Sequence, residues 1–519
     1  MTSPAAPRAD ADVIVIGAGH NALICAGYLA AAGLEVLVLE ARDIVGGDTV
    51  TEELTLPGFQ HDTCSSAHVV LQSNPVIRDD ELGLLARYGL RYVCTDPAFV
   101  MPVDDSAVVV SRDVDATAEQ LARWSTEDAA ALREMMARWH GGLAGAHARY
   151  SAGLPPTGEP ADLEYQELRS SSAWDVVHRT FHHPISRALM TWLAFATITP
   201  PHRPGTGALP AAITSGRLRF GWATPIGGSG ALPAALLAQL ADHGATVLTS
   251  SPVRRILTSA GRATGVLTED GRRYLARRAV VSSAHLAVTA SMVDGAEPAD
   301  LRRAAASWRP GLALFAVHVA LRADISYPTS PGPDRAVAGA LGTPAGLSRQ
   351  VQGCFQGLLE RDAPWLLIVN STVVDPNRAP NGGGILKLLT TAPSRLAGGR
   401  EWDEQTATGY AEHLLELVSR RVRGADTSSV LATAVESPAH LARRNPHNLG
   451  GSCHGGEFDL GNGTVIPGWL DHRGELAGLY YTGSTTHPGG SVSGRPGRNT
   501  AHRVLVDLGI DPATVMSTP

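Results

Sequence analysis

The fold is decided by residues 12–47, which read DVIVIGAGHNALICAGYLAAAGLEVLVLEARDIVGG. Residues 13–16 form a continuous apolar run of strand length, and a glycine loop and a helical stretch follow it directly. Gly17 permits the tight turn, Gly19 lets the backbone approach a pyrophosphate, and small Ala22 lets the helix pack closely on the strand. This order of elements predicts a dinucleotide-binding unit in which the helix N-terminus donates to the phosphates.

A second strand and an acidic residue complete the predicted unit. Gly33 fits a helix end, and residues 36–39 form another apolar strand that is closed by Glu40. The Glu40 carboxylate can accept hydrogen bonds from both ribose hydroxyls, whereas it would repel a 2′-phosphate. The sequence therefore predicts a dinucleotide with an unmodified ribose and disfavours NADP.

The residues that follow Glu40 resemble a known superfamily. Gly46 and Gly47 stand at the spacing seen in the amine oxidases and phytoene desaturases, where such a pair lets the chain pass close to the pyrophosphate. Most amine oxidases have arginine directly after the pair, but here Asp48 and Thr49 follow, as in members nearer to the carotene ketolases and the desaturase-like pyridine nucleotide-disulphide oxidoreductases. The resemblance implies FAD as the cofactor, bound by Gly17, Gly19, His20, Asn21, Glu40, Ala41, Gly46, Gly47, Asp48 and Thr49.

The C-terminal region resembles the same family. Residues 478–483, GLYYTG, read as a short strand that ends in glycine, and residues 484–494 form a glycine-rich loop before a helix that begins near Asn499. In carotenoid desaturases and ketolases this arrangement places backbone donors near the flavin, where they stabilise the negative charge that develops on reduction. The resemblance implies flavin contacts from Gly483, Ser491 and Val492.

A second glycine-rich loop, GGSGALP at residues 227–233, imitates a dinucleotide loop but lacks its context. The residues before it include Trp222 and Pro225 rather than a continuous strand, and no acid stands where a ribose partner belongs. No NAD site is predicted. By resemblance this stretch enters the second segment of the FAD domain, where Val253 offers backbone contacts to adenine.

The predicted fold class is α/β, with a Rossmann-type FAD-binding domain assembled from three sequence segments and an α+β substrate domain made of a mixed sheet and a helical insertion. Helical spacing with many Ala, Leu and Arg residues marks the insertion, and alternating apolar runs mark the sheet. The predicted segments are 1–105, 221–299 and 446–519 for the FAD domain, 106–220 for the helical insertion and 300–445 for the substrate-domain sheet.

Catalytic residues are predicted from two loops. By resemblance, residues 61–68, here called the flavin-facing segment, approach the isoalloxazine. His68 in this segment and His487 in the C-terminal loop are the candidates for a catalytic acid or base, with a structural role as the alternative for each. The other candidates for lining the flavin are His61, Asp62, Ser65 and Ser66.

No metal site is predicted. The five cysteines are scattered without ligand spacing, and they are expected to be reduced and mostly buried. Adjacent His182 and His183 point in different directions on a helix, and a helix-end cap explains them better.

The position of the single lysine bears on the substrate. Amine oxidases of the superfamily usually carry a lysine near the flavin N5, on a strand that corresponds here to residues 312–319, and these contain none. Lys387, the only lysine of the chain, lies too far along the sequence to match. An amine oxidase is therefore expected less than a desaturase.

A flavin without a visible NAD site takes hydride from a substrate at N5 and passes the electrons to oxygen or a quinone. The sequence predicts an FAD-dependent dehydrogenase, desaturase or oxidase that acts on a lipophilic or polycyclic small molecule. The alternatives are a flavin amine oxidase, a carotenoid ketolase and a redox-neutral isomerase. A non-enzymatic binder of the prenyl-chaperone type is the least favoured, because both flavin-facing motifs are intact.

Charge and composition exclude other classes of partner. The net charge of −7 arises from interspersed acids and bases without a basic block, so nucleic-acid binding is not expected. No signal-peptide pattern and no uninterrupted apolar run of about 18 residues is present, so the expected location is the cytoplasm. Peripheral membrane contact is expected only because a carotenoid-like substrate is extracted from lipid, and the oligomeric state stays open.

Overall fold

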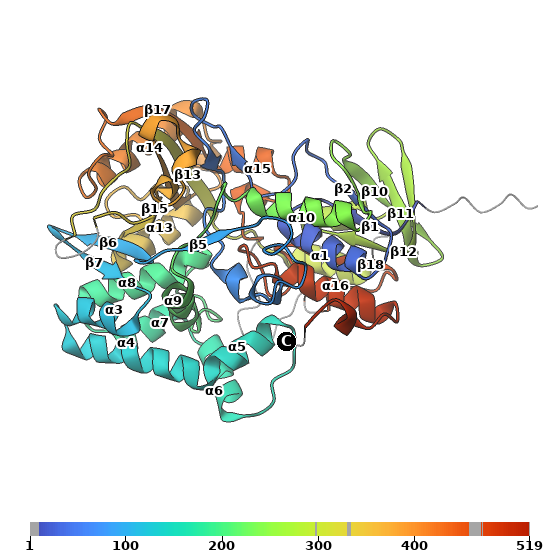
Figure 1. Cartoon of the computed structure of the whole chain (residues 1–519), viewed down its shortest axis with the longest axis horizontal. Helices are drawn as coiled ribbons and strands as arrows, with labels where there is room; N and C mark the ends of the chain where they lie inside the picture. The colour runs from blue at the N-terminus through green and yellow to red at the C-terminus, as the bar shows by residue number, and fades with distance from the viewer. Residues whose placement is uncertain (1–9, 296–297, 330–333, 456–468, 470, 518–519) are drawn as a thin grey trace, which may run out of the picture.

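Two seven-stranded sheets organise the chain (Figure 1). The computed structural model describes residues 10–295, 298–329, 334–455, 469 and 471–517. The first sheet and its helices lie on the right in Figure 1, the second sheet lies at the upper left, and a group of helices lies below the second sheet.

The first sheet has a parallel centre. β1 lies between β12 and β2, β9 follows β2, β18 pairs in parallel with the end of β12, and β10, β11 and β12 form an antiparallel meander. These strands are β1 (Ala11–Ile16), β2 (Val36–Leu39), β9 (Thr246–Leu248), β10 (Val253–Ser259), β11 (Arg262–Thr268), β12 (Arg273–Ser282) and β18 (Leu479–Tyr481).

Both faces of the first sheet are covered, which explains why residues 13–16 of β1 are continuously apolar rather than alternating. Val13 and Val15 join one hydrophobic cluster with the helices α1 and α16, whereas Ile14 and Ile16 join another cluster on the opposite face. The helices that cover the sheet are α1 (His20–Ala31), α10 (Ala231–Asp242), α11 (Leu286–Met292), α12 (Ala299–Ser307) and α16 (Arg495–Asp507).

Three distant parts of the chain supply the strands of this sheet, as the Rossmann-type prediction requires. The predicted boundary at residue 105 falls inside the hairpin of β6 (Phe99–Val103) and β7 (Ser106–Val110). This hairpin belongs to the second sheet, because β6 pairs in parallel with β14 (Ala338–Leu341).

The second sheet has the order β17-β13-β16-β15-β14-β6-β7, and Phe315, Val317 and Val319 on one face of β13 pack against α14. Because neighbouring side chains in a strand point to opposite faces, His318 lies on the other face, and the register pairs it with Lys387 of β16. The remaining strands and helices of this domain are β13 (Ala313–Leu321), β15 (Leu366–Val369), β16 (Gly384–Ala392), β17 (Val430–Glu436), α13 (Pro344–Gln356), α14 (Glu404–Ser419) and α15 (Pro438–Arg444).

The helical insertion packs against the second sheet through a cluster that includes Trp192, Phe195 and Trp365. His183 accepts a hydrogen bond from the backbone N–H of Ile185 and caps the start of α8, as the helix-cap interpretation predicts. The helices are α3 (Val114–Ala122), α4 (Thr126–Arg138), α5 (Ala144–Ser151), α6 (Pro160–Ser170), α7 (Ala173–Thr180), α8 (Pro184–Ala194) and α9 (Leu209–Phe220).

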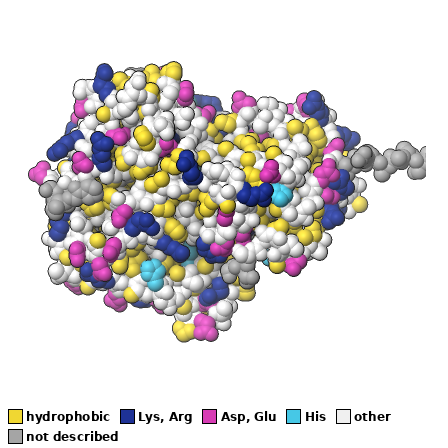
Figure 2. Space-filling model, viewed as in Figure 1, with side chains coloured by type: hydrophobic (Ala, Val, Ile, Leu, Met, Phe, Trp, Pro, Cys, Tyr) yellow, Lys and Arg dark blue, Asp and Glu magenta, His cyan; other side chains and the backbone are white. Residues whose placement is uncertain are grey.

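Short elements link these layers and carry part of the site. They are α2 (Pro75–Arg78), the strand pair β3 (Thr51–Glu52) and β4 (His61–Asp62), and the strand pair β5 (Tyr92–Cys94) and β8 (Ala223–Pro225). On the face drawn in Figure 2, acidic and basic side chains are interspersed. Among the helices of the described residues, none combines the length and the apolar character that a bilayer crossing requires.

Candidate functional site

The glycine loop after β1 is tightly packed against the neighbouring strand. Gly17 has φ of +88°, and a Cβ atom built on it would collide with Ser283 Oγ. Ser283 Oγ in turn donates to the carbonyl oxygen of Ile16 at 2.8 Å. Gly19 precedes α1 without a side-chain cap, so the first N–H groups of the helix point at the space where a phosphate is expected.

The glycine pair lies directly against this loop. Gly46 donates its N–H to the carbonyl oxygen of Ala18 at 2.8 Å and forms a bridge with Gly19. A Cβ atom on Gly47 would lie 3.2 Å from Gly19 Cα. Thr49 Oγ1 donates to Gly46 O at 2.7 Å and holds the turn. Two backbones that approach this closely form a cradle suited to a pyrophosphate, so the donor set fits the ADP half of FAD.

Glu40 lies at the adenosine end of the cradle. One carboxylate oxygen accepts from Ala18 N at 2.6 Å and the other from Arg42 N at 2.9 Å, which orients the acid towards the glycine loop. Ser251 donates its N–H to Glu40 O at 2.8 Å, and Val253 begins β10 two residues later. The structure therefore brings Glu40 and Val253 to one end of the site, next to exposed Ala41.

The C-terminal loop closes the cradle from the other side. Gly483 has φ of +92°, and a Cβ atom on it would lie 3.1 Å from Ser283 O, so it shares with Gly17 the contact to Ser283. Ser491 also has a positive φ, of +75°, and Val492 beside it is buried. The two ends of the chain thus meet at the carboxyl ends of β1 and β12.

Two predicted contact residues at the start of α1 face this loop. Asn21 Oδ1 accepts from Gly497 N at 3.4 Å in the first turn of α16. Burial lowers the pKa of His20 to about 4, and a hydrogen bond with the backbone of Ser491 partly offsets this shift.

Asp48 Oδ1 accepts from the side-chain amides of Asn445 and Asn448, each at 3.0 Å. Every predicted cofactor contact therefore lies around one cradle, and their roles in binding stay predictions.

His68 is held by both ring nitrogens. Nδ1 lies 2.9 Å from Tyr92 Oη and Nε2 lies 2.9 Å from Ser229 Oγ. Burial lowers its pKa to about 3, His20 adds to the shift and the Asp62 carboxylate opposes it. These contacts tie the flavin-facing segment to β5 and to the start of α10, which favours a positioning role.

His487 is packed between the two halves of the molecule. Its Nε2 donates to the carbonyl oxygen of Tyr150, and its ring lies edge-on to Tyr150 and to Trp469 with centroids 4.9 Å apart in each case. Burial lowers its pKa to about 4, and the hydrogen bond to Tyr150 opposes the shift. The neutral His487 ring therefore tethers the C-terminal loop to Tyr150 through this hydrogen bond.

Lys387 is a site residue that the sequence interpretation set aside. Antiparallel pairing places Lys387 directly beside His318, on the strand next to residues 312–319, although it lies far from them along the chain. Its Nζ donates to Cys64 O and, at 3.2 Å, to Ser66 Oγ, so the single lysine touches the flavin-facing segment. Burial lowers its pKa, while Cys64, Asp62 and Glu436 oppose the shift.

A buried histidine pair lies beside this lysine. His318 Nε2 donates to a carboxylate oxygen of Glu436 at 2.9 Å, and its ring lies edge-on to His61 at 5.6 Å. Within the described residues, His318 Nδ1 has no hydrogen-bond partner. Burial, with help from His318, lowers the pKa of His61 to about 3. A single-strand pattern cannot reveal this cluster, because the residues come from β4, β13, β16 and β17.

Asp62 and Arg378 anchor the segment through a buried ion pair. Arg378 Nη1 lies 2.9 Å from Asp62 Oδ2, and the exposed fractions of the two residues are only 1% and 4%. Burial alone raises the pKa of Asp62, but Arg378, Ser229 N and Thr51 outweigh it and hold the pKa below the usual value. A cavity of about 10 Å³ beside this pair is also lined by Ser66 and Lys387.

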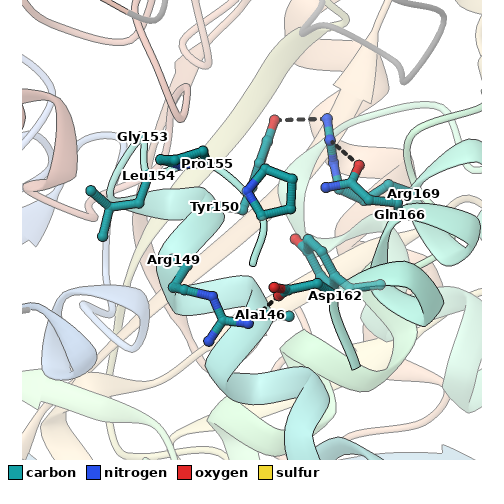
Figure 3. Close-up of a pocket in the computed structure, with 11 residues that line it drawn as sticks. Ala146, Arg149, Tyr150, Gly153, Leu154, Pro155, Asp162, Gln166 and Arg169 are labelled. Atoms are coloured by element: carbon teal, nitrogen blue, oxygen red, sulfur yellow. Dashed lines mark hydrogen bonds and ion pairs between the residues drawn. The ribbon is translucent and has the colours of Figure 1, made fainter. Parts of the chain in front are cut away.

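A larger cavity, of about 370 Å³, lies between α5 and α6 of the helical insertion (Figure 3). Arg149 forms an ion pair with Asp162 at its edge, and Arg169 donates to Tyr150 Oη at 2.8 Å. Because Tyr150 both lines this cavity and contacts His487, the insertion is linked to the C-terminal loop.

Comparisons with known proteins agree with this geometry. The model of the family described as flavin containing amine oxidoreductase matches residues 23–505. Pyridine nucleotide-disulfide oxidoreductase domain-containing protein 2 of Mus musculus is 28% identical, over 96% of this chain and 94% of that protein. One of the subunits of limonene dehydrogenase from Castellaniella defragrans is 25% identical, over 96% of this chain and 95% of that protein. The solved structure of cyclohexylamine oxidase from Brevibacterium oxydans matches with a TM-score of 0.58 at 17% identity, covering 96% of this chain and 100% of that chain.

Proposed function

Since this chain belongs to the flavin containing amine oxidoreductase family, we propose that it removes a hydride from a lipophilic or polycyclic small molecule. It is an FAD-dependent oxidoreductase. When bound, FAD accepts a hydride at N5 and releases the electrons to oxygen or a quinone. The chain itself must hold the substrate C–H bond over that position and exclude water.

An apolar substrate is supported by the sheet face that carries Lys387. Leu314, Ala316 and Leu389 on this face join the hydrophobic cluster of the helical insertion, and Ala320 packs with Phe59. The limonene dehydrogenase of Castellaniella defragrans, whose subunit resembles this chain over nearly its full length, is named for a hydrocarbon substrate. The apolar surroundings of Lys387 are the observation that carries the proposal, because a group that reacts at Lys387 must be placed among buried apolar side chains, where a polar substrate would lose its hydrogen bonds to water.

Lys387 and His318 are the proposed groups that hold or move a proton. Lys387 is the ionisable side chain that donates to the flavin-facing segment at Cys64 and Ser66, and burial lowers its pKa, so more of the lysine is in the neutral form that can accept a proton. His318 is oriented by Glu436 and has a second nitrogen that accepts a proton without displacing a partner among the described residues. The predicted role of His68 as acid or base is less favoured, since both of its ring nitrogens serve as tethers. His487 is tethered through Nε2 alone, and its Nδ1 has no hydrogen-bond partner among the described residues, so its role as acid or base stays a prediction.

An amine oxidase is the second candidate, and one observation favours it. Residues 312–319 lack the lysine that amine oxidases usually carry, but Lys387 lies beside the flavin-facing segment from the neighbouring strand. In an amine oxidase, Lys387 would assist proton transfer during oxidation of a carbon–nitrogen bond. A ketolase or a redox-neutral isomerase would use the same frame, and no feature of the described site favours either.

The deciding experiment is anaerobic bleaching of the flavin absorption by a panel of polyenes, cyclic terpenes and amines. Bleaching by a polyene or a cyclic hydrocarbon, with amines inert, is the expected result. Bleaching by amines alone would replace the proposal with the amine oxidase. Each polyene and each cyclic terpene is paired with its saturated analogue, which must leave the spectrum unchanged.

Cofactor binding is tested separately with Gly19→Val. A Cβ atom on Gly19 meets nothing closer than Gly47 Cα at 4.0 Å, so the fold accepts it, but the branched side chain fills the phosphate cradle. The variant is expected to purify folded and colourless, as judged by circular dichroism and visible absorption. A variant as yellow as the wild type would contradict the placement of the pyrophosphate.

A further inference from the structure

Two cysteines from distant parts of the chain meet beside Lys387. Cys64 lies in the flavin-facing segment after β4, and Cys453 follows the short helix η8 (Leu449–Gly451). The two Sγ atoms and a carboxylate oxygen of Asp48 all lie within 4.8 Å of one another, and all three residues are half-buried. The expectation that the cysteines are mostly buried holds for Cys25 but not for this pair.

We propose that Cys64 and Cys453 are a redox-active pair that forms an intramolecular disulfide when the protein meets a peroxide. A disulfide requires the sulfurs to approach to about 2 Å, which is within reach of side-chain rotation and a small backbone shift from this separation. Both cysteines lie outside helices and strands, so no ladder of backbone hydrogen bonds resists that shift.

The surroundings assign an order to the two thiols. Lys387 donates to the backbone oxygen of Cys64, so the buried lysine contacts Cys64 directly. The hydrogen bond to Cys64 and burial raise the pKa of Cys453 well above the usual value, and the Asp48 and Glu436 carboxylates add to the shift. Cys64 is therefore the first nucleophile, and the Cys453 sulfur then attacks the oxidised Cys64 to form the disulfide.

The reaction balances with a peroxide as the oxidant. The Cys64 sulfur attacks one peroxide oxygen and the O–O bond breaks. One molecule of water leaves, and a sulfenic acid remains on Cys64. The Cys453 sulfur then attacks that sulfur and loses its proton, the S–O bond breaks, and a second water leaves. Two thiols lose two electrons and two protons, and hydrogen peroxide becomes two molecules of water.

A metal site is the competing explanation, because two cysteines and an aspartate offer three ligands of two types that zinc accepts. Two contacts disfavour it. Asp48 Oδ1 already accepts from the side-chain amides of Asn445 and Asn448, so two donors hold that oxygen.

A disulfide here would change the site. It would join the flavin-facing segment to residues 445–453, whose Asn445 and Asn448 hold Asp48 next to the glycine pair. The bond would also remove the free Cys64 thiol beside Lys387. Oxidation is thus expected to slow substrate-driven flavin bleaching reversibly, whichever substrate proves correct.

Peptide mapping of the full-length holoprotein tests the proposal. The protein is reduced, freed of reductant, treated with one equivalent of hydrogen peroxide, alkylated and digested with trypsin. Cleavage after arginine yields residues 43–78 with Cys64 as their only cysteine and residues 445–473 with Cys453 as theirs. The expected result is one linked pair of these peptides that a phosphine reductant separates.

Variants and metal analysis supply the controls. Cys64→Ser and Cys453→Ser must each abolish the linked pair, whereas Cys354→Ser, at another half-buried cysteine, must leave it intact. The peptide map of the wild-type protein tests the proposal even if one of these variants folds poorly. Separate oxidation of both cysteines to sulfinic acids, a linkage to a different cysteine, or a zinc ion bound one to one that shields both thiols would overturn the proposal.

Discussion

Lys387 shows how one residue acquires chemistry from its neighbours. It is the only lysine in a chain whose other basic side chains are arginines and histidines, and it lies buried beside Ser66 and His318. Arginine keeps its proton in almost every setting, but a buried lysine releases it more easily. A site that needs a group able to gain and lose a proton therefore favours lysine at this position.

Lys387→Met is expected to slow anaerobic bleaching by the fastest substrate of the panel by about 10²- to 10⁴-fold, the usual contribution of a general acid or base. Because burial lowers the pKa of Lys387, the wild-type rate rises with pH through that lowered pKa, and the variant loses the rise. Stopped-flow absorbance from pH 6 to 10 measures both effects. An unchanged pH profile at full flavin content would remove Lys387 from the proton transfer.

Arg378 and Arg133 form a matched pair of charged residues that differ in burial. Arg378 pairs with buried Asp62, whereas the side chains of Arg133 and its partner Asp115 are 42% and 66% exposed. Arg378→Met leaves a buried carboxylate unpaired and is expected to lower the free energy of unfolding by about 3–5 kcal/mol. Arg133→Met is expected to cost less than about 1 kcal/mol. Urea unfolding at one pH compares them, and equal losses would contradict the role of burial.

At the level of elements, the unit β1–loop–α1 depends on packing as well as on backbone conformation. Gly17 and Gly33 lie at opposite ends of the loop and α1 with nearly equal φ, +88° and +83°. A Cβ atom on Gly17 would clash with Ser283 Oγ, whereas one on Gly33 would meet nothing within 4 Å. Replacing each glycine by alanine therefore separates the cost of a left-handed backbone conformation from the cost of a steric clash.

Gly33→Ala is expected to lower the free energy of unfolding by about 1–2 kcal/mol, the cost of a left-handed conformation for alanine. Gly17→Ala adds the collision with Ser283 and is expected to cost more and to weaken FAD binding. Urea unfolding and fluorescence titration with FAD measure the two quantities. Equal stability and equal affinity in both variants would mean that the loop is not pinned by Ser283.

At the level of the whole molecule, buried neutral histidines link stability to pH. Their pKa values fall from 6.5 to about 4 or about 3, chiefly through burial. Between pH 6.5 and 4 the unfolded chain therefore binds protons that the folded chain does not bind, so stability decreases as the pH falls. The histidines are His20, His61, His68, His147, His285, His454, His472 and His487.

The free energy of unfolding of the holoprotein is expected to fall by at least about 1.4 kcal/mol per pH unit in this window, which corresponds to one proton or more. Urea titrations at pH 7.5, 6.5, 5.5 and 4.5 provide the slope. His182→Gln, at a side chain that is 55% exposed, serves as the control and must leave the slope unchanged. A flat profile would show that the histidines do not remain neutral in the fold.

Local patterns in the sequence were sufficient for the dinucleotide unit. The strand before Gly17, the uncapped helix start after Gly19 and the acid at Glu40 each depend on residues close in the chain, and the structure places them as expected. The boundary at residue 105 was less accurate, because the hairpin β6–β7 has the same local pattern whichever sheet it joins.

The amino-acid sequence by itself determined the cofactor class, since glycine conformation, helix start and ribose acid act over a few neighbouring residues. Only the tertiary structure decided the catalytic surroundings. His318 and Lys387 become neighbours through strand pairing, and Cys64 meets Cys453 through the packing of two segments that are far apart in the chain. Such contacts join residues far apart in the chain, and burial then changes their acidity, so neither spacing nor composition along the sequence predicts them.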